Sequence, residues 1–89
     1  MAAIAKLRIM PLSVETNLSK LMVDAKKLIL NSGGKIPRFE EEPIAFGLKA
    51  LNATFLWSEE KELETLEMGI REIRGVKSVE LVDIRKAIG

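Results

Sequence analysis

The organisation of this chain is set by residues 17–34, which read NLSKLMVDAKKLILNSGG. Apolar residues recur here at intervals of three and four, the spacing of one buried helical face. Asn17 is a preferred N-cap residue, and the pair Gly33-Gly34 is typical of a helix end. We therefore predict an amphipathic helix, whose buried face consists of Leu18, Leu21, Met22, Ala25, Leu28 and Ile29.

Strand patterns lie on both sides of this helix. Residues 3–10 (AIAKLRIM) alternate as a half-buried strand does, and Pro11 should end its regular pairing. Residues 35–42 also have strand character, but Pro37 restricts them to a sheet edge or a strand start. The first half of the chain therefore predicts strand, helix, strand.

The second half repeats this order. Residues 48–57 (LKALNATFLW) predict a long strand whose buried face contains Leu51, Ala53, Phe55 and Trp57. Ser58 is expected to cap a second helix, and Gly75 to follow its end directly. Residues 76–85 predict the last strand. The apolar stripe of the second helix is Leu63, Leu66, Ile70 and Ile73.

The order β-α-β-β-α-β is that of the ferredoxin-like fold. We expect an α+β domain, an α/β sandwich in which a four-stranded antiparallel sheet carries two helices on one face. With 89 residues, the chain should form one domain over residues 1–89. A chain of this size buries only about 60–65% of its unfolded surface. Functional groups should therefore lie on a face or a loop, and the fold alone does not identify their function.

The amino-acid composition excludes several classes of catalytic and metal site. The chain has no cysteine and no histidine, which excludes a thiolate nucleophile, a histidine base and a zinc site with these ligands. Its 14 basic and 13 acidic residues give a net charge of +1, so charge does not indicate a nucleic-acid or membrane partner. No apolar run approaches the roughly 20 residues that span a bilayer, and no secretory signal is visible. We expect a cytoplasmic protein without cofactor, metal or catalytic residues.

A second informative stretch is EEEPIAFGLKAL, residues 40–51. Three successive glutamates in a strand face alternate sides, so we interpret them as a solvated, edge-protecting run and not as metal ligands. Pro43 and Gly47 enclose the apolar residues Ile44 and Phe46. From residue types alone, Phe46 either folds back on the core or is held out as an anchor.

Three other functions are compatible with this fold. A regulatory domain would pair its sheet with another and bind a small molecule at the seam. An RNA-binding module would need basic and aromatic residues on its central strands, and LKALNATFLW does not provide them. An acylphosphatase-type enzyme would need a glycine-rich loop after the first strand, where this chain has Met10-Pro11-Leu12-Ser13.

Residues 41–51, with Met10-Pro11 and the final VDIR of residues 82–85, resemble the exchange domain of the translation elongation factor 1-beta family. Its short archaeal members carry Glu-Glu-Pro-Ile-Ala-Phe-Gly-Leu, as residues 41–48 do here. The resemblance covers essentially the whole chain. It implies a guanine-nucleotide exchange factor, not an enzyme, which promotes GDP release from elongation factor 1-alpha so that GTP can rebind during aminoacyl-tRNA delivery.

The resemblance also implies a partner-binding site for this GTPase, in its GDP-bound and nucleotide-free forms. Phe46 matches a loop aromatic and Lys86 a C-terminal lysine, both of which contact the GTPase near its nucleotide and magnesium; Arg85 is the alternative to Lys86. Neither nucleic acid nor membrane should be bound directly, and the protein alone should be monomeric. The expected partner-binding residues are Pro43, Ile44, Phe46, Gly47, Lys49, Arg85 and Lys86.

Overall fold

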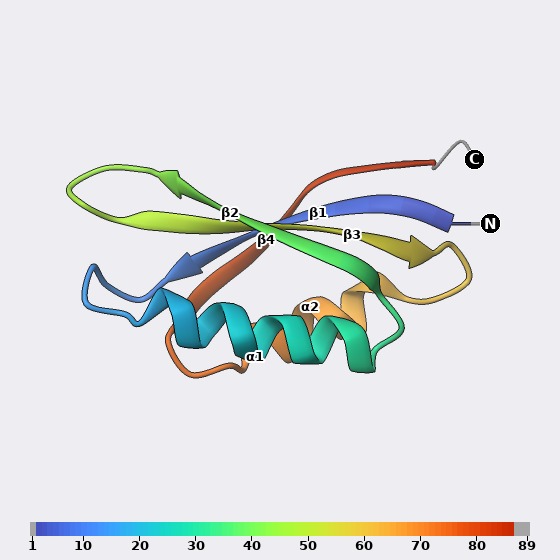
Figure 1. The fold of residues 1–89 in the computed structure, drawn as a ribbon, viewed down its shortest axis with the longest axis horizontal. Helices are drawn as coiled ribbons and strands as arrows, with labels where there is room; N and C mark the ends of the chain where they lie inside the picture. Colours follow the sequence, from blue (N-terminus) through green and yellow to red (C-terminus); the bar gives the residue numbers. More distant parts are fainter. Residues whose placement is uncertain (1, 87–89) are drawn as a thin grey trace.

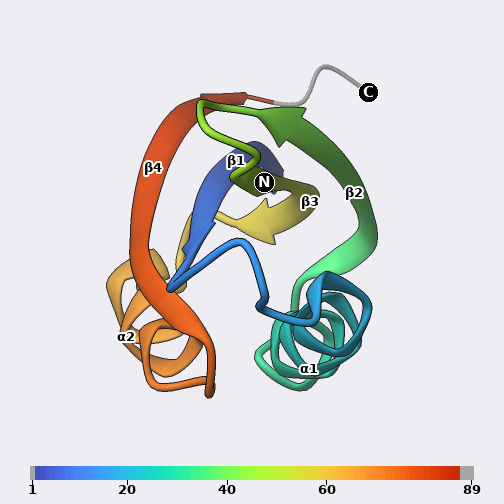
Figure 2. The ribbon, with the colours of Figure 1, turned by 90° about the vertical axis from the view of Figure 1, so that its left-hand side faces the viewer.

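The computed structural model describes residues 2–86 and has the predicted order of elements (Figure 1). The elements are β1 (Ala2–Pro11), α1 (Leu18–Asn31), β2 (Lys35–Pro43), β3 (Lys49–Ser58), α2 (Leu63–Arg71) and β4 (Val76–Lys86). The strands form one antiparallel sheet in the order β2-β3-β1-β4. Both helices cover the same face of this sheet (Figure 2). The expected ferredoxin-like α+β fold is confirmed.

The core lies between the sheet and the two helices. Alternate residues of β1 and β3 are buried against the helices, and the rings of Phe55 and Trp57 meet edge to face with centroids 5.9 Å apart. The predicted apolar stripes of both helices contribute buried or partly buried residues. From the helices, the fully buried residues are Leu21, Ala25, Ile29, Leu66 and Ile70.

The sequence predicts the start of α1 correctly but not the start of α2. The Oδ1 atom of Asn17 accepts a hydrogen bond from the Lys20 N–H at 3.1 Å, so the predicted cap of α1 is confirmed. The prediction that Ser58 caps α2 is wrong, because Ser58 is the last residue of β3. Trp57 Nε1 donates to the Lys61 carbonyl at 3.1 Å, and Lys61 N–H donates to the Ser58 carbonyl at 3.1 Å. This turn moves the start of α2 to Leu63.

The end of α2 also lies earlier than expected. The helix ends at Arg71, so Gly75 does not follow it directly. Gly75 has a φ of 97° and belongs to the turn into β4, in which Val76 N–H donates to the Ile73 carbonyl at 3.1 Å. A positive φ at this turn is the reason that glycine suits the position.

The outer strands β2 and β4 are both irregular. Pro37 lies on edge strand β2, as predicted, and the pairing of β2 with β3 shifts between Lys35 and Arg38. The pairing of β4 with β1 shifts beside Lys6 and Leu7. Such irregularities disfavour pairing of an edge with another chain.

The two ends of the sheet carry different segments. The molecule measures 39 × 20 × 18 Å. One end carries the β2–β3 hairpin, the β1–α1 loop and the α2–β4 turn, whereas β1 begins and β4 finishes at the opposite end (Figure 1). Within residues 2–86, no helix is long and apolar enough to cross a membrane.

Candidate functional site

The β2–β3 hairpin presents Phe46 at one end of the sheet. Pro43 and Lys49 are the last paired residues. Beyond them, Ile44 N–H donates to the Leu48 carbonyl at 2.8 Å, and Leu48 N–H donates to the Ala45 carbonyl at 2.9 Å. The two residues at the tip of the turn have positive φ, 53° for Phe46 and 81° for Gly47. Positive φ at both central positions is characteristic of a type I′ turn, which favours Asn-Gly.

Phe46 is an unusual residue for such a tip. Its side chain is 99% exposed, so the ring does not fold back on the core. A left-handed backbone costs a non-glycine residue about 1–2 kcal/mol, and an exposed phenylalanine forgoes about 1.5–3 kcal/mol of burial. Backbone strain of this kind is concentrated at functional sites. The geometry therefore favours the second reading of Phe46, a side chain held out toward a partner.

Five of the expected site residues meet at this hairpin. Ile44 is 44% exposed and lies beside Phe46 in the turn. The Lys49 Nζ atom lies 3.6 Å from Glu41 Oε1 on the surface. The residues that the hairpin brings together are Pro43, Ile44, Phe46, Gly47 and Lys49.

Arg85 and Lys86 lie at the opposite end of the sheet. Lys86 pairs with Ala3, which on its other side pairs with Trp57 of β3. From Lys49, at the hairpin, to Trp57 is eight residues of extended chain, or about 26 Å at about 3.3 Å per residue. The structure therefore does not bring Lys86 and Phe46 together, and the expected site residues fall into two separate groups.

The two C-terminal cations differ in their surroundings. The Arg85 guanidinium contacts Asp83 Oδ2 through Nη2 at 2.8 Å and through Nε at 3.0 Å. Lys86 forms no ion pair with any residue of the described range 2–86. Both cations line a hollow of about 290 Å³, together with Leu63 and Glu59. Because Asp83 offsets the charge of Arg85, Lys86 is the better candidate for an acting cation.

A polar network lies at the base of the hairpin, on the open face of the sheet. Arg8 contacts Glu42 Oε1 at 3.3 Å through Nε, and Glu80 Oε1 at 3.2 Å through Nη1. Asn52 Nδ2 donates to Glu42 Oε1 at 2.9 Å. This hydrogen bond is the main reason that the pKa of Glu42 lies below its ordinary value; partial burial opposes the shift, and the charge of Arg8 adds to it. The network connects all four strands.

This network corrects the interpretation of residues 40–42 as a uniformly solvated run. Glu40 and Glu41 are exposed, but Glu42 is only partly so and is engaged with Arg8 and Asn52. The prediction that successive glutamates face opposite sides of the sheet is confirmed. Glu40 and Glu42 pair with Asn52 and Ala50, which alternate with the helix-facing residues of β3, so both glutamates lie on the face away from the helices. Arg8 and Asn52 carried no sequence signal for this role.

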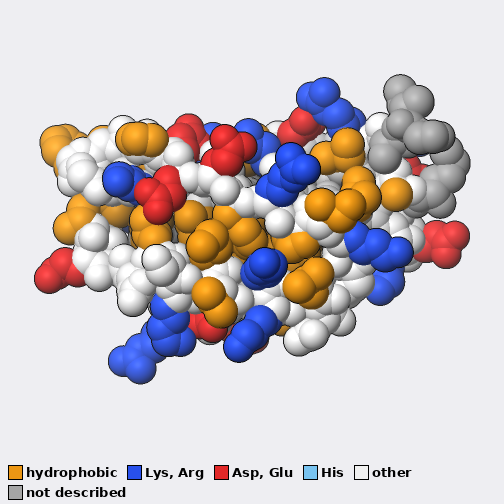
Figure 3. All heavy atoms as spheres, in the orientation of Figure 1, with side chains coloured by type: hydrophobic (Ala, Val, Ile, Leu, Met, Phe, Trp, Pro, Cys, Tyr) orange, Lys and Arg blue, Asp and Glu red, His pale blue; other side chains and the backbone are white. Residues whose placement is uncertain are grey.

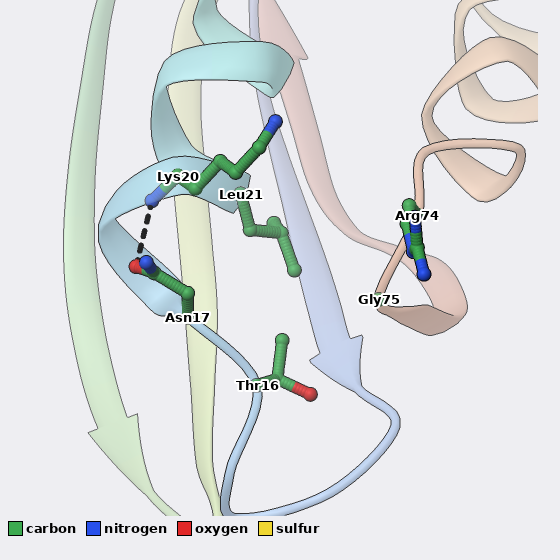
Figure 4. Close-up of a pocket in the computed structure, with 6 residues that line it drawn as sticks. All are labelled: Thr16, Asn17, Lys20, Leu21, Arg74 and Gly75. Carbon is green, nitrogen blue, oxygen red and sulfur yellow. Dashed lines mark hydrogen bonds between the residues drawn. The ribbon is translucent and has the colours of Figure 1, made fainter.

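A hollow of about 320 Å³ opens beside the start of α1, at the hairpin end (Figure 4). Asn17 is engaged there as the helix cap, and Lys20 Nζ contacts Asp24 Oδ2 at 3.1 Å. No group of three or more Asp or Glu side chains in the described part of the chain is arranged to hold a metal. The lining residues are Thr16, Asn17, Lys20, Leu21, Arg74 and Gly75.

The β1–α1 loop also reaches this end. Leu12 and Val14 are 63% and 60% exposed. The sequence interpretation gave these side chains no role. The sequence contains only a weak indication that Leu12 and Val14 are exposed. Both are apolar, and both fall outside the periodic patterns of the strand before them and the helix after them.

Comparison with known proteins identifies relatives that cover most of the chain. The family model described as EF-1 guanine nucleotide exchange domain matches residues 4–87. Elongation factor 1-beta of Methanosarcina barkeri (strain Fusaro / DSM 804) is 40% identical over 81 residues, which is 90% of this chain and 91% of the relative. Elongation factor 1-beta of Methanocaldococcus jannaschii is 38% identical over 86 residues, 94% of this chain and 96% of the relative.

Solved structures support the fold. The ACT domain from GTP pyrophosphokinase of Chlorobium tepidum superposes with a TM-score of 0.67 at 20% identity, over 92% of this chain and 100% of that chain. The C-terminal domain of the MgtC protein from Mycobacterium tuberculosis gives 0.70 at 15% identity, over 89% and 84%. These similarities concern architecture alone, because fold does not determine function.

Proposed function

Because this chain belongs to the EF-1 guanine nucleotide exchange domain family, we propose that it promotes GDP release from elongation factor 1-alpha so that GTP can rebind. The family match favours this function over the small-molecule and RNA-binding alternatives. At the level of residues, one observation supports it: Phe46 is 99% exposed on a turn with a left-handed backbone. Such a side chain contributes nothing to the core and is available to a partner.

The activity needs no covalent chemistry. An exchange factor binds the nucleotide-free GTPase more tightly than the GDP-bound form, and by linkage it weakens nucleotide binding by the same factor. A hundredfold preference corresponds to about 2.7 kcal/mol. Contacts of a few surface side chains are sufficient for a difference of this size.

Phe46 acts in this proposal as an apolar anchor in a pocket of the GTPase. Aromatic side chains at the centre of an interface cost about 2–4 kcal/mol when they are truncated. The hairpin hydrogen bonds at Ile44 and Leu48 hold the turn in place. Little ordering is therefore required when the complex forms.

Lys86 supplies the second contact, on the magnesium side. In GTPases a magnesium ion bridges the nucleotide phosphates and the protein. An ammonium group placed beside its ligands would compete with the ion and weaken the hold on GDP. Because about 26 Å of strand separates Lys86 from the hairpin, the GTPase must extend along the length of the sheet to meet both groups.

The test is stopped-flow release of a fluorescent GDP analogue from the cognate GTPase. Wild-type protein should accelerate release, and Phe46→Ala and Lys86→Ala should each reduce that acceleration at least tenfold. Ile36→Ala and Lys26→Ala are controls. Ile36 matches Phe46 in being exposed (63%) and in having a positive φ (51°), but it lies at the end of β2 away from the hairpin; Lys26 is an exposed lysine of α1. The controls should behave as wild type. Absence of acceleration by the wild-type protein would refute the function, and unimpaired variants would refute the residue roles.

A further inference from the structure

A second apolar loop lies beside the Phe46 hairpin. A Cβ atom placed on Gly47 would lie 3.6 Å from Val14 Cγ1, so Val14 is adjacent to the tip of the turn. A hollow of about 230 Å³ is lined by residues of both loops, among them Ser13 and Val14 on one side and Gly47 and Lys49 on the other. The β1–α1 loop and the hairpin therefore form one continuous surface, at the left-hand end of Figure 3, where hydrophobic side chains are exposed.

The β1–α1 loop is held by its own hydrogen bonds. Leu12 N–H donates to the Gly75 carbonyl at 2.9 Å, which ties the loop to the α2–β4 turn. Thr16 N–H donates to the Ser13 carbonyl, and Ser13 N–H donates to Thr16 Oγ1, both at 3.2 Å. The backbone is thus fixed while Leu12 and Val14 remain exposed. A preorganised apolar surface loses little conformational entropy when it binds.

Phe46 alone is too small for a specific interface. Such interfaces bury about 800 Å² on each partner, whereas a phenylalanine buries about 150–250 Å². Neighbouring side chains must supply the rest. The large apolar side chains exposed at this end are Leu12, Val14, Ile44 and Phe46.

The surrounding charges fit the same interpretation. Lys49 lines the same hollow as Val14, and Arg74 directly precedes Gly75, whose carbonyl accepts the hydrogen bond from Leu12 N–H. An apolar centre with a polar rim is the usual anatomy of a protein–protein contact.

We propose that Leu12 and Val14 extend the Phe46 site into one apolar docking surface for elongation factor 1-alpha. The β1–α1 loop contacts an apolar region of the GTPase next to the pocket that receives Phe46. This inference rests on the proposed function and names a further part of the same interface. The occupant is the GTPase and not a second copy of this chain, because the surface is continuous with the Phe46 contact.

The experiment measures the affinity of nucleotide-free GTPase for Leu12→Ser and Val14→Ser. Each side chain is about 60% exposed, and loss of its burial should weaken binding about fivefold to thirtyfold. Val23→Ser and Leu30→Ser are matched controls on α1, with side chains 47% and 48% exposed. They should bind as wild type does. Thermal unfolding of each variant confirms that the domain is folded.

Phe46→Ala separates failure of this inference from failure of the proposed function. If wild-type protein neither binds the GTPase nor accelerates GDP release, both are overturned. If Phe46→Ala weakens binding while Leu12→Ser and Val14→Ser bind normally, the function stands and the extended surface is refuted. Sedimentation of the chain alone gives one further outcome. If the serine variants abolish self-association and leave exchange unchanged, the surface is a dimer contact and the inference is overturned.

Discussion

The backbone and the ring of Phe46 should respond in opposite directions to replacement by asparagine. The residue has a φ of 53°, which asparagine adopts more readily than phenylalanine. The ring is 99% exposed, so its removal takes no packing from the core. Relief of a left-handed cost of about 1–2 kcal/mol should stabilise Phe46→Asn by about 1 kcal/mol. For a domain of this size, that raises the Tm by about 4–8 °C.

Exchange should fall in the same variant. Loss of a central aromatic anchor costs about 2–4 kcal/mol of binding, so stimulated GDP release should slow about 30-fold to 1000-fold. Thermal unfolding followed by circular dichroism gives the first quantity, and stopped-flow nucleotide release gives the second. A gain in stability accompanied by a loss of function is the signature expected of a strained contact residue.

Phe46→Ala is the matched control for this prediction. Alanine removes the ring but keeps a Cβ atom at the left-handed position, so its Tm should stay near that of the wild type while exchange falls equally. A lower Tm for Phe46→Asn would show that the ring supports the fold and would refute the strain reasoning. Normal exchange by either variant would refute the anchor role.

Three further outcomes test the surrounding structure. Gly47→Ala should lower stability by about 1 kcal/mol in thermal unfolding, because its φ is 81°; an unchanged Tm would contradict this. Glu42→Gln should be less stable than wild type at neutral pH. Since folding lowers the Glu42 pKa, this difference should be complete above about pH 4.3 and disappear as the pH falls through the folded value. Urea titrations at a series of pH values from 7 downward measure it, and a difference that does not decrease anywhere in the acidic range would argue against the carboxylate. Trp57→Phe should lose at least about 1 kcal/mol in urea unfolding, because its Nε1 hydrogen bond to Lys61 is removed.

The parts of the fold that the sequence predicts are those set by neighbours along the chain. The cap at Asn17 forms with a backbone group three residues away, so local residue types are sufficient to identify it. Pro37 excludes a central strand by its own chemistry. Ser58 has the right chemistry for a cap, but the hydrogen bond between Trp57 and Lys61 fixes a turn there. A tertiary contact thus overrides a local preference.

The site is less predictable, because its elements are distant in sequence. The network at the hairpin base joins Arg8, Glu42 and Glu80 through strand pairing, and no local pattern marks it. Residue types alone do not decide whether the Phe46 ring is buried in the core or exposed, since its exposure depends on which residues the fold places beside it. The distance from Phe46 to Lys86 follows only once the register of the strands is known.

In the proposed complex, the separation of the hairpin from the end of β4 makes strand length a functional quantity. A single residue inserted into β3 would reverse which side chains face the helices. Two inserted residues would preserve the alternation but would move the tip outward by about 6.6 Å, beyond the reach of a partner fitted to both ends. A loop outside the proposed docking surface, such as the connection between α1 and β2, can therefore change length with little consequence for exchange, whereas β3 cannot. Insertions of two residues into β3 should leave a folded protein that no longer stimulates nucleotide release.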